Sequence, residues 1–143
     1  MTPVKFVALV LLSSALVSAP APASNLEKVI ADYVGLYKRE TLPEWKKLFL
    51  PHFTVASTRE DGTVGERTLE EFYEVQTRYF ASGRDIKEVL ENVQIEPRGK
   101  LASVWADFVL TDNGETRRGK LVLLLIEGPE GFKIHSLMFS YYG

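Results

Sequence analysis

The sequence has no cysteine and only two histidines among its 143 residues. Without cysteine the chain can form neither a disulfide nor a lipid-modified cysteine, so its stability must come from packing alone. The histidines, His52 and His135, lack the paired spacing of metal ligands. We therefore expect no dedicated metal site, and nothing in the sequence points to a cofactor.

A strong excess of one charge is also missing, because 17 basic residues face 19 acidic residues, for a net charge of −2. There is no basic stripe and no acidic tail, so nucleic acid is not an expected partner. Internal repeats and low-complexity linkers are absent as well. The sequence therefore predicts one domain with one core.

A secretory signal is predicted over residues 1–23, which contain one lysine, an apolar run from Phe6 to Val17 and then small residues. The run is shorter than the ~20 apolar residues that span a bilayer, although an uncleaved anchor is the alternative. Cleavage after Ala23 would leave a domain of residues 24–143. This predicts a periplasmic or secreted protein with no membrane span after cleavage.

Helical spacing of apolar residues appears in three segments, 25–40, 41–51 and 68–83. The second is expected to be a short helix that ends near Pro51, and Gly83 suits the end of the third. Capping residues are available in each: Asn25 in the first, Thr41 with Glu44 in the second, and Thr68 with Glu71 in the third.

Strand-like patterns occupy most of the remaining sequence. Asp61-Gly62 predicts a hairpin within residues 53–67, and four extended runs follow at 85–97, 100–111, 115–127 and 131–142. Arg98-Gly99, Asn113-Gly114 and residues 128–131 separate these runs. Helices first and a long meander afterwards predict an α+β domain, with the helices on one side of an antiparallel sheet.

The stretch KLVLLLIE, residues 120–127, is apolar on both faces of its predicted strand. Leu121, Leu123 and Leu125 point one way, and the alternating residues Val122, Leu124 and Ile126 point the other. The helices can cover only one face, and large exposed apolar surfaces are usually interfaces. We therefore predict a homodimer through the outer sheet face, with Trp105 on the neighbouring strand as a candidate contact.

The order of elements resembles the nuclear transport factor 2-like superfamily, which includes ketosteroid isomerases, scytalone dehydratases and SnoaL-like polyketide cyclases. The resemblance lies in two helices, a hairpin, a helix entered through GERTLEEFY, and long strands that end in GFKIHSLMFSYY. LASVWADFVL, Gly119 and GFKI are most similar to uncharacterised bacterial members. The resemblance implies a cone-shaped α+β barrel, in which three N-terminal helices pack in the concave face of a strongly curved sheet around an apolar ligand pocket.

The resemblance also implies positions for the pocket residues. Tyr33 and Tyr73 match tyrosines of the steroid isomerases, and the implied wall comprises Phe49, Val104, Ala106, Phe108, Leu137, Phe139 and Tyr141. The family's catalytic base position is Ser57 here, and its acid position falls near Val122. Serine is too weak a base for that proton transfer and valine donates nothing, so we expect no steroid isomerase activity.

Two ionisable residues are candidates for a general base. Alternation places His135 on the face of Leu137 and Phe139, where it could transfer protons or simply bond to backbone. The same alternation places Asp107 on the face of Trp105, which favours a rim or interface charge. Only a strand bulge would bring Asp107 and His135 together as catalytic groups.

The remaining polar candidates have both structural and functional interpretations. Gln76 interrupts an apolar helical stripe and must hydrogen-bond either to a neighbouring strand or to a ligand. Tyr33 and Tyr73 are core aromatics or pocket donors. The sequence favours binding of a small apolar molecule, with Tyr33, Ser57, Tyr73, Gln76 and His135 as polar contacts. The alternatives are a lyase, isomerase or hydrolase that uses His135 or Asp107, and a dimeric protein-interaction module.

Overall fold

The computed structural model describes residues 21–142, so most of the predicted signal, residues 1–20, lies outside the described residues. The helices are α2 (Ala21–Gly35), the 3₁₀ turn η2 (Arg39–Thr41), α3 (Leu42–Lys46) and α4 (Leu69–Ala81). The strands are β1 (Phe49–Thr58), β2 (Val64–Thr68), β3 (Ile86–Arg98), β4 (Leu101–Asp112), β5 (Glu115–Gly128) and β6 (Gly131–Tyr141). Within this range no helix is long and apolar enough to cross a membrane.

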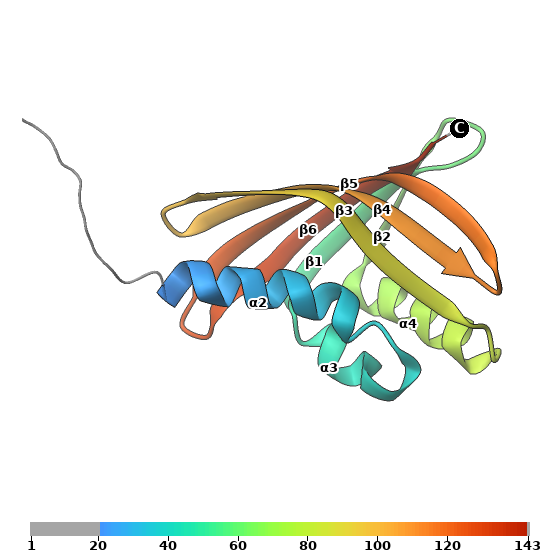
Figure 1. Cartoon of the computed structure of the whole chain (residues 1–143), viewed down its shortest axis with the longest axis horizontal. Helices are drawn as coiled ribbons and strands as arrows, with labels where there is room; N and C mark the ends of the chain where they lie inside the picture. Colours follow the sequence, from blue (N-terminus) through green and yellow to red (C-terminus); the bar gives the residue numbers. More distant parts are fainter. Residues whose placement is uncertain (1–20, 143) are drawn as a thin grey trace, which may run out of the picture.

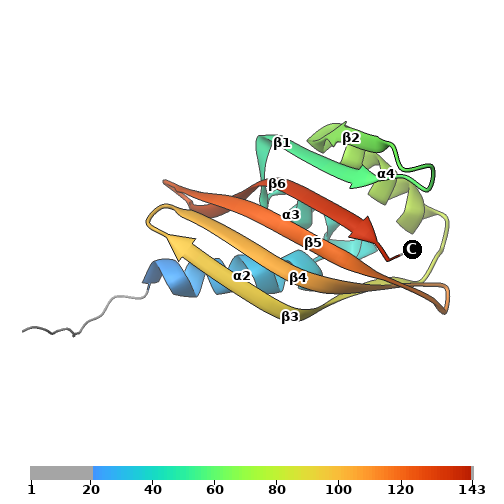
Figure 2. The same cartoon turned by 90° about the horizontal axis from the view of Figure 1, so that it is seen from above.

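The strands form one six-stranded, open and curved sheet in the order β2-β1-β6-β5-β4-β3. The helices of residues 21–142 lie on one face, which we call the inner face, and none of them covers the outer face (Figures 1 and 2). This confirms the predicted α+β architecture. Neighbouring strands are antiparallel except for β1 and β6, which are parallel. A tight hairpin imposes antiparallel pairing only on the strands that it joins, and β1 and β6 share no such turn.

Strand β5 carries KLVLLLIE and has the alternation that the sequence predicts. Leu121, Leu123 and Leu125 are at most 2% exposed on the inner face. On the outer face Leu124 and Ile126 are more than 40% exposed. Val122 is buried on that face, between its register partners on β4 and β6.

The predicted capping box at the start of α4 is present. The Thr68 hydroxyl accepts from the Glu71 backbone N–H at 3.2 Å, and the Glu71 carboxylate accepts from the Thr68 N–H at 2.9 Å. Gly83 follows the helix with a φ of +81°, as its predicted role in ending the helix requires. This helix therefore has the boundaries that its sequence predicts.

The other two predicted caps are wrong. The Thr41 side chain does not cap α3, and its hydroxyl instead donates to the Leu36 carbonyl at 2.7 Å. Helix α2 begins at Ala21, so Asn25 lies inside it rather than at its N-cap. The Asn25 carbonyl oxygen accepts from the Phe132 N–H at 2.7 Å, which ties α2 to the β5–β6 turn. The boundary after Ala23 falls in the first turn of α2, and cleavage there stays a prediction.

Candidate functional site

A cavity of about 460 Å³ lies between the inner sheet face and the helices. The helical side contributes five of its aromatic side chains, namely Tyr33, Tyr37, Trp45, Phe72 and Tyr79. The sheet contributes Phe108, Phe139 and Tyr141. Aromatic rings therefore supply much of the wall, as expected for a site that binds an apolar molecule.

The three aromatic rings of the sheet pack edge to face. Ring centroids of Phe108 and Tyr141 are 5.3 Å apart, and those of Phe108 and Phe139 are 5.9 Å apart. Gly119 makes this packing possible, because its register partners are Phe108 and Tyr141. A Cβ atom at Gly119 would lie 2.5 Å from the Phe108 ring and 2.2 Å from the Ser140 carbonyl oxygen.

Two tyrosines, Tyr33 in α2 and Tyr37 in the connection that follows it, place hydroxyl groups in the cavity region. The Tyr37 hydroxyl donates to the side-chain oxygen of buried Gln76, so this amide oxygen of α4 has its hydrogen-bond partner in the connection between α2 and η2. Burial raises the pKa of both Tyr33 and Tyr37 above the ordinary tyrosine value, with a smaller contribution from Glu88. Both groups therefore stay protonated at neutral pH and can act as hydrogen-bond donors.

Glu88 is the acidic residue that β3 contributes to the cavity wall. It lies on the inner face, because its register partner on β4 is Leu110, another wall residue. Burial raises the pKa of its carboxyl to about 7. A carboxyl with this pKa is partly protonated at neutral pH and can either accept or donate a proton.

Arginines surround the opening of the cavity. Arg84 pairs with Asp112 at 2.9 Å, and Arg67 lies on the rim from β2. The guanidinium carbon of Arg117 lies 3.8 Å from the centroid of the Tyr141 ring, a cation–π contact. All three arginines are exposed to solvent, so they form the rim rather than the interior.

The structure brings six of the predicted binding residues to the cavity wall: Tyr33, Ser57, Gln76, Phe108, Leu137 and Tyr141. Their role in binding stays a prediction. Phe49 and Ala106 are buried in the core next to the wall instead of lining it. Tyr73 is half-buried outside the cavity, with the Lys46 ammonium 4.7 Å from its ring centroid.

The expected position of His135 is wrong. The β5–β6 register shifts where Leu124 pairs with Ser136 and Leu125 pairs with Ile134, which leaves His135 without a partner. This bulge interrupts the alternation, so His135 is exposed and does not line the cavity.

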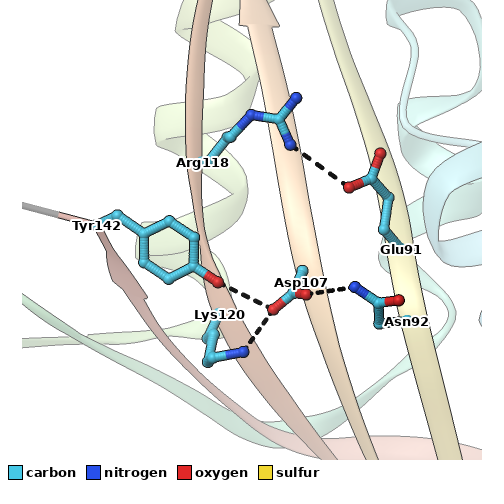
Figure 3. Close-up of polar contacts among 6 residues, drawn as sticks. All are labelled: Glu91, Asn92, Asp107, Arg118, Lys120 and Tyr142. Carbon is cyan, nitrogen blue, oxygen red and sulfur yellow. Dashed lines mark hydrogen bonds and ion pairs between the residues drawn. The ribbon is translucent and has the colours of Figure 1, made fainter.

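Asp107 lies on the outer face, as the alternation predicts. Its carboxylate accepts hydrogen bonds from Lys120 at 2.6 Å, Asn92 at 2.7 Å and Tyr142 at 3.0 Å (Figure 3). These bonds lower the pKa of Asp107 to about 2. Because β4 and β5 pair without a register shift, the alternative in which a bulge turns Asp107 inward to meet His135 is wrong.

Sequence reasoning missed Glu88 and Tyr37. A signal for Glu88 was available, since strict alternation in β3 puts it on the same face as Ile86 and Leu90. A single acidic residue on an otherwise apolar strand face is the pattern that indicates Glu88 as a candidate site residue. Among residues 25–142 no three histidine, aspartate or glutamate side chains converge as a metal site would require.

Solved structures with the same arrangement identify the fold. A proposed dehydratase of the NTF2-like family from Streptomyces avermitilis superposes with a TM-score of 0.70 at 14% identity, and the match covers 87% of this chain and 99% of that one. An NTF2-like protein of unknown function from Shewanella baltica gives a TM-score of 0.67 at 13% identity, with 88% and 98% covered. The chain has an NTF2-like fold.

A third structural neighbour shows how varied the assignments on this scaffold are. A proposed aromatic ring hydroxylase from Novosphingobium aromaticivorans matches with a TM-score of 0.69 at 12% identity, and covers 88% of this chain and 92% of that one. No protein-family model and no curated protein sequence matches the chain. The structural similarity therefore establishes the fold, and any activity of this chain has to be argued from the residues of the chain itself.

Proposed function

We propose that this NTF2-like domain binds a small, largely apolar molecule in its cone. The observation that carries the proposal is the 460 Å³ cavity, whose wall is rich in aromatic rings and whose arginines lie at the exposed rim. Its volume lies within the range of about 300–1,000 Å³ typical of small-molecule sites. Since His135 and Asp107 lie outside the cavity, the enzymatic alternatives built on them have no support from the geometry.

Native mass spectrometry of gently purified protein, followed by thermal shift across a lipid and metabolite panel, tests this proposal. We expect a retained small molecule, or a ligand that stabilises the fold by about 2.7 kcal/mol at a hundred times its Kd. Ser57→Trp should fill the cavity and abolish the shift, whereas Thr54→Trp, at an exposed position on the same strand, should preserve it. An empty cavity with no stabilising ligand would contradict the proposal.

We further propose that the protein functions as an exported homodimer, and the bare outer face supports the dimer. Leu101, Trp105 and Met138 are each more than half exposed there. Ile126 is the register partner of Leu101, and Leu124 precedes Ile126 on the same face of β5. We call these five residues the outer patch. Patches of this kind are uncommon on monomeric proteins. Export is supported by the order of charged, apolar and small residues in positions 1–23.

A further inference from the structure

Glu88 and Asp112 are the acidic residues of the cavity wall, and they differ in their surroundings. Strand β3 begins shortly after α4 and passes alongside α2 (Figure 1), so its inner face is turned toward the helices and the cavity. Glu88 lines the cavity and also a groove between α2 and β3, which explains its partial exposure. Its inner-face neighbours along the strand, Ile86 and Leu90, are both apolar.

Among residues 25–142, Glu88 has neither a hydrogen bond nor an ion pair, and burial is the only cause that shifts its pKa. By contrast, Asp112 of the cavity wall is paired with Arg84, and Asp107 on the outer face is paired with Lys120. A buried charge is usually compensated by a partner of opposite charge. This carboxyl therefore leaves a position in the cavity where a positive group would be stabilised.

The surrounding rings also favour a positive group. Aromatic faces carry negative potential and attract cations. Tyr141 already receives the Arg117 guanidinium on its ring at 3.8 Å. A carboxylate ligand beside Glu88 would meet a like charge, and a neutral ligand would leave the carboxylate uncompensated above its pKa.

The geometry points to an apolar organic cation as the ligand of this cone, with an ammonium group paired to Glu88 and an aryl or alkyl body held among the aromatic rings. This inference rests on the proposed function and names the ligand class. The arginines of the rim do not cancel the attraction. They are exposed and screened by solvent and salt, Arg84 is paired with Asp112, and Arg117 is stacked on Tyr141.

The test uses three probes with one apolar body and different head groups: phenylbutylamine, phenylbutanol and phenylbutanoate. Dissociation constants are measured by calorimetry at about pH 5.5 and about pH 8, a range in which the amine, with a pKa of about 10, stays protonated. At the higher pH the amine should bind about tenfold more tightly than the alcohol. At the lower pH, where Glu88 is protonated, its affinity should fall by about tenfold or more.

The other ionisable groups near Glu88 define what must be controlled. Tyr33 from α2, Tyr37 from the connection after it and Tyr141 from β6 lie near Glu88, and their pKa values are all raised, so they stay neutral in this range. The remaining charged groups of the cavity and the α2–β3 groove are Lys38, Arg67, Arg84, Asp85, Lys87, Asp112 and Arg117. Glu88→Gln preserves all of these groups and both histidines, so its difference from the wild type isolates the Glu88 carboxyl.

In Glu88→Gln the amine should bind no more tightly than the alcohol, and its dissociation constant should no longer depend on pH. The dissociation constant of the alcohol should stay within about threefold of the wild-type value. Glu96→Gln, at an exposed and ion-paired position on the same strand, should behave like the wild type. If the alcohol binds and the amine gains nothing, or if phenylbutanoate binds most tightly, the inference is overturned and the proposed function stands. If none of the three probes binds, the inference is overturned; if the wider panel also fails, so is the proposed function.

Discussion

At the scale of the single residue, Gly119 is a position where the cone has no room for a side chain. It lies on the inner face of β5 under the packed rings, and an added methyl group would collide with a backbone carbonyl as well as with Phe108. We expect Gly119→Ala to lower the free energy of unfolding by about 3 kcal/mol, measured by urea denaturation. Gly128→Ala on the same strand, where an added Cβ meets nothing within 4 Å, should be nearly neutral. Equal stabilities of the two variants would contradict this explanation of Gly119.

Glu88 should make the stability of the ligand-free protein fall as pH rises. Its pKa is about 7 in the folded state and about 4.3 in an unfolded chain, so between these values the folded state holds the extra proton. Ionisation of the carboxyl therefore opposes folding, by an amount on the order of 3 kcal/mol above pH 7. We expect Glu88→Gln to raise the melting temperature at about pH 8 and to change it little at about pH 4.

Glu96→Gln provides the matched control for that measurement, because Glu96 lies on the same strand but is exposed and paired with Arg98. A Glu88→Gln variant that is no more stable than Glu96→Gln at about pH 8 would show that the carboxyl carries no burial penalty.

The sheet face of a residue was predictable wherever strict alternation held. Phe108, Leu137 and Tyr141 line the cavity as the resemblance implies, and they stay on the inner face because β4 continues without interruption and the bulge in β6 precedes Leu137. His135 was misplaced because it is itself the inserted residue. A period-two pattern cannot reveal an extra residue when the residues on both sides of it are apolar or small.

At the scale of the element, α4 depends on a cap that its sequence predicts. Removal of the Thr68 hydroxyl leaves the Glu71 backbone N–H without its acceptor at the helix start. We expect Thr68→Ala to cost about 1 kcal/mol, which corresponds to a fall of about 4 °C in melting temperature. Thr77→Ala, in the exposed middle of the same helix, should be neutral or slightly stabilising, since alanine has the higher helix propensity.

The cap at Thr41 shows why the same sequence motif does not always give the same structure. Thr41 and Glu44 have the spacing of Thr68 and Glu71, yet the Thr41 hydroxyl bonds to the Leu36 carbonyl left at the end of α2. A four-residue pattern cannot show such a competing acceptor. The strand hairpins were more predictable, because Asn113 and Gly114 both have positive φ angles, which few other residue pairs adopt readily.

At the scale of the whole molecule, the outer patch should govern self-association. We expect the wild type to sediment as a dimer at micromolar concentration, and Trp105→Glu to sediment as a folded monomer, because it places a charge in the apolar interface. Val64→Glu changes an equally exposed apolar residue separated from Trp105 by three strands, and should leave the dimer intact. A wild type that sediments as a monomer would contradict the proposed dimer.

The architecture was more predictable than the contents of the site. Hairpin turns and the helical spacing of apolar residues both depend on local sequence. They were sufficient to predict the succession of helices and strands along the chain. The cavity depends on where four separate elements converge. Glu88 from β3, Tyr33 from α2, Gln76 from α4 and Tyr141 from β6 meet only through the tertiary fold.

The parallel pairing of β1 with β6 affects how the chain folds during synthesis. The last strand is inserted between the first strand and β5, so the middle of the sheet cannot be completed until the C-terminal segment has left the ribosome. Contacts between such distant segments slow the search for the native topology. Nascent chains that end before Gly131 should accordingly be good substrates for chaperones and proteases, because β1 and β5 then have no strand between them.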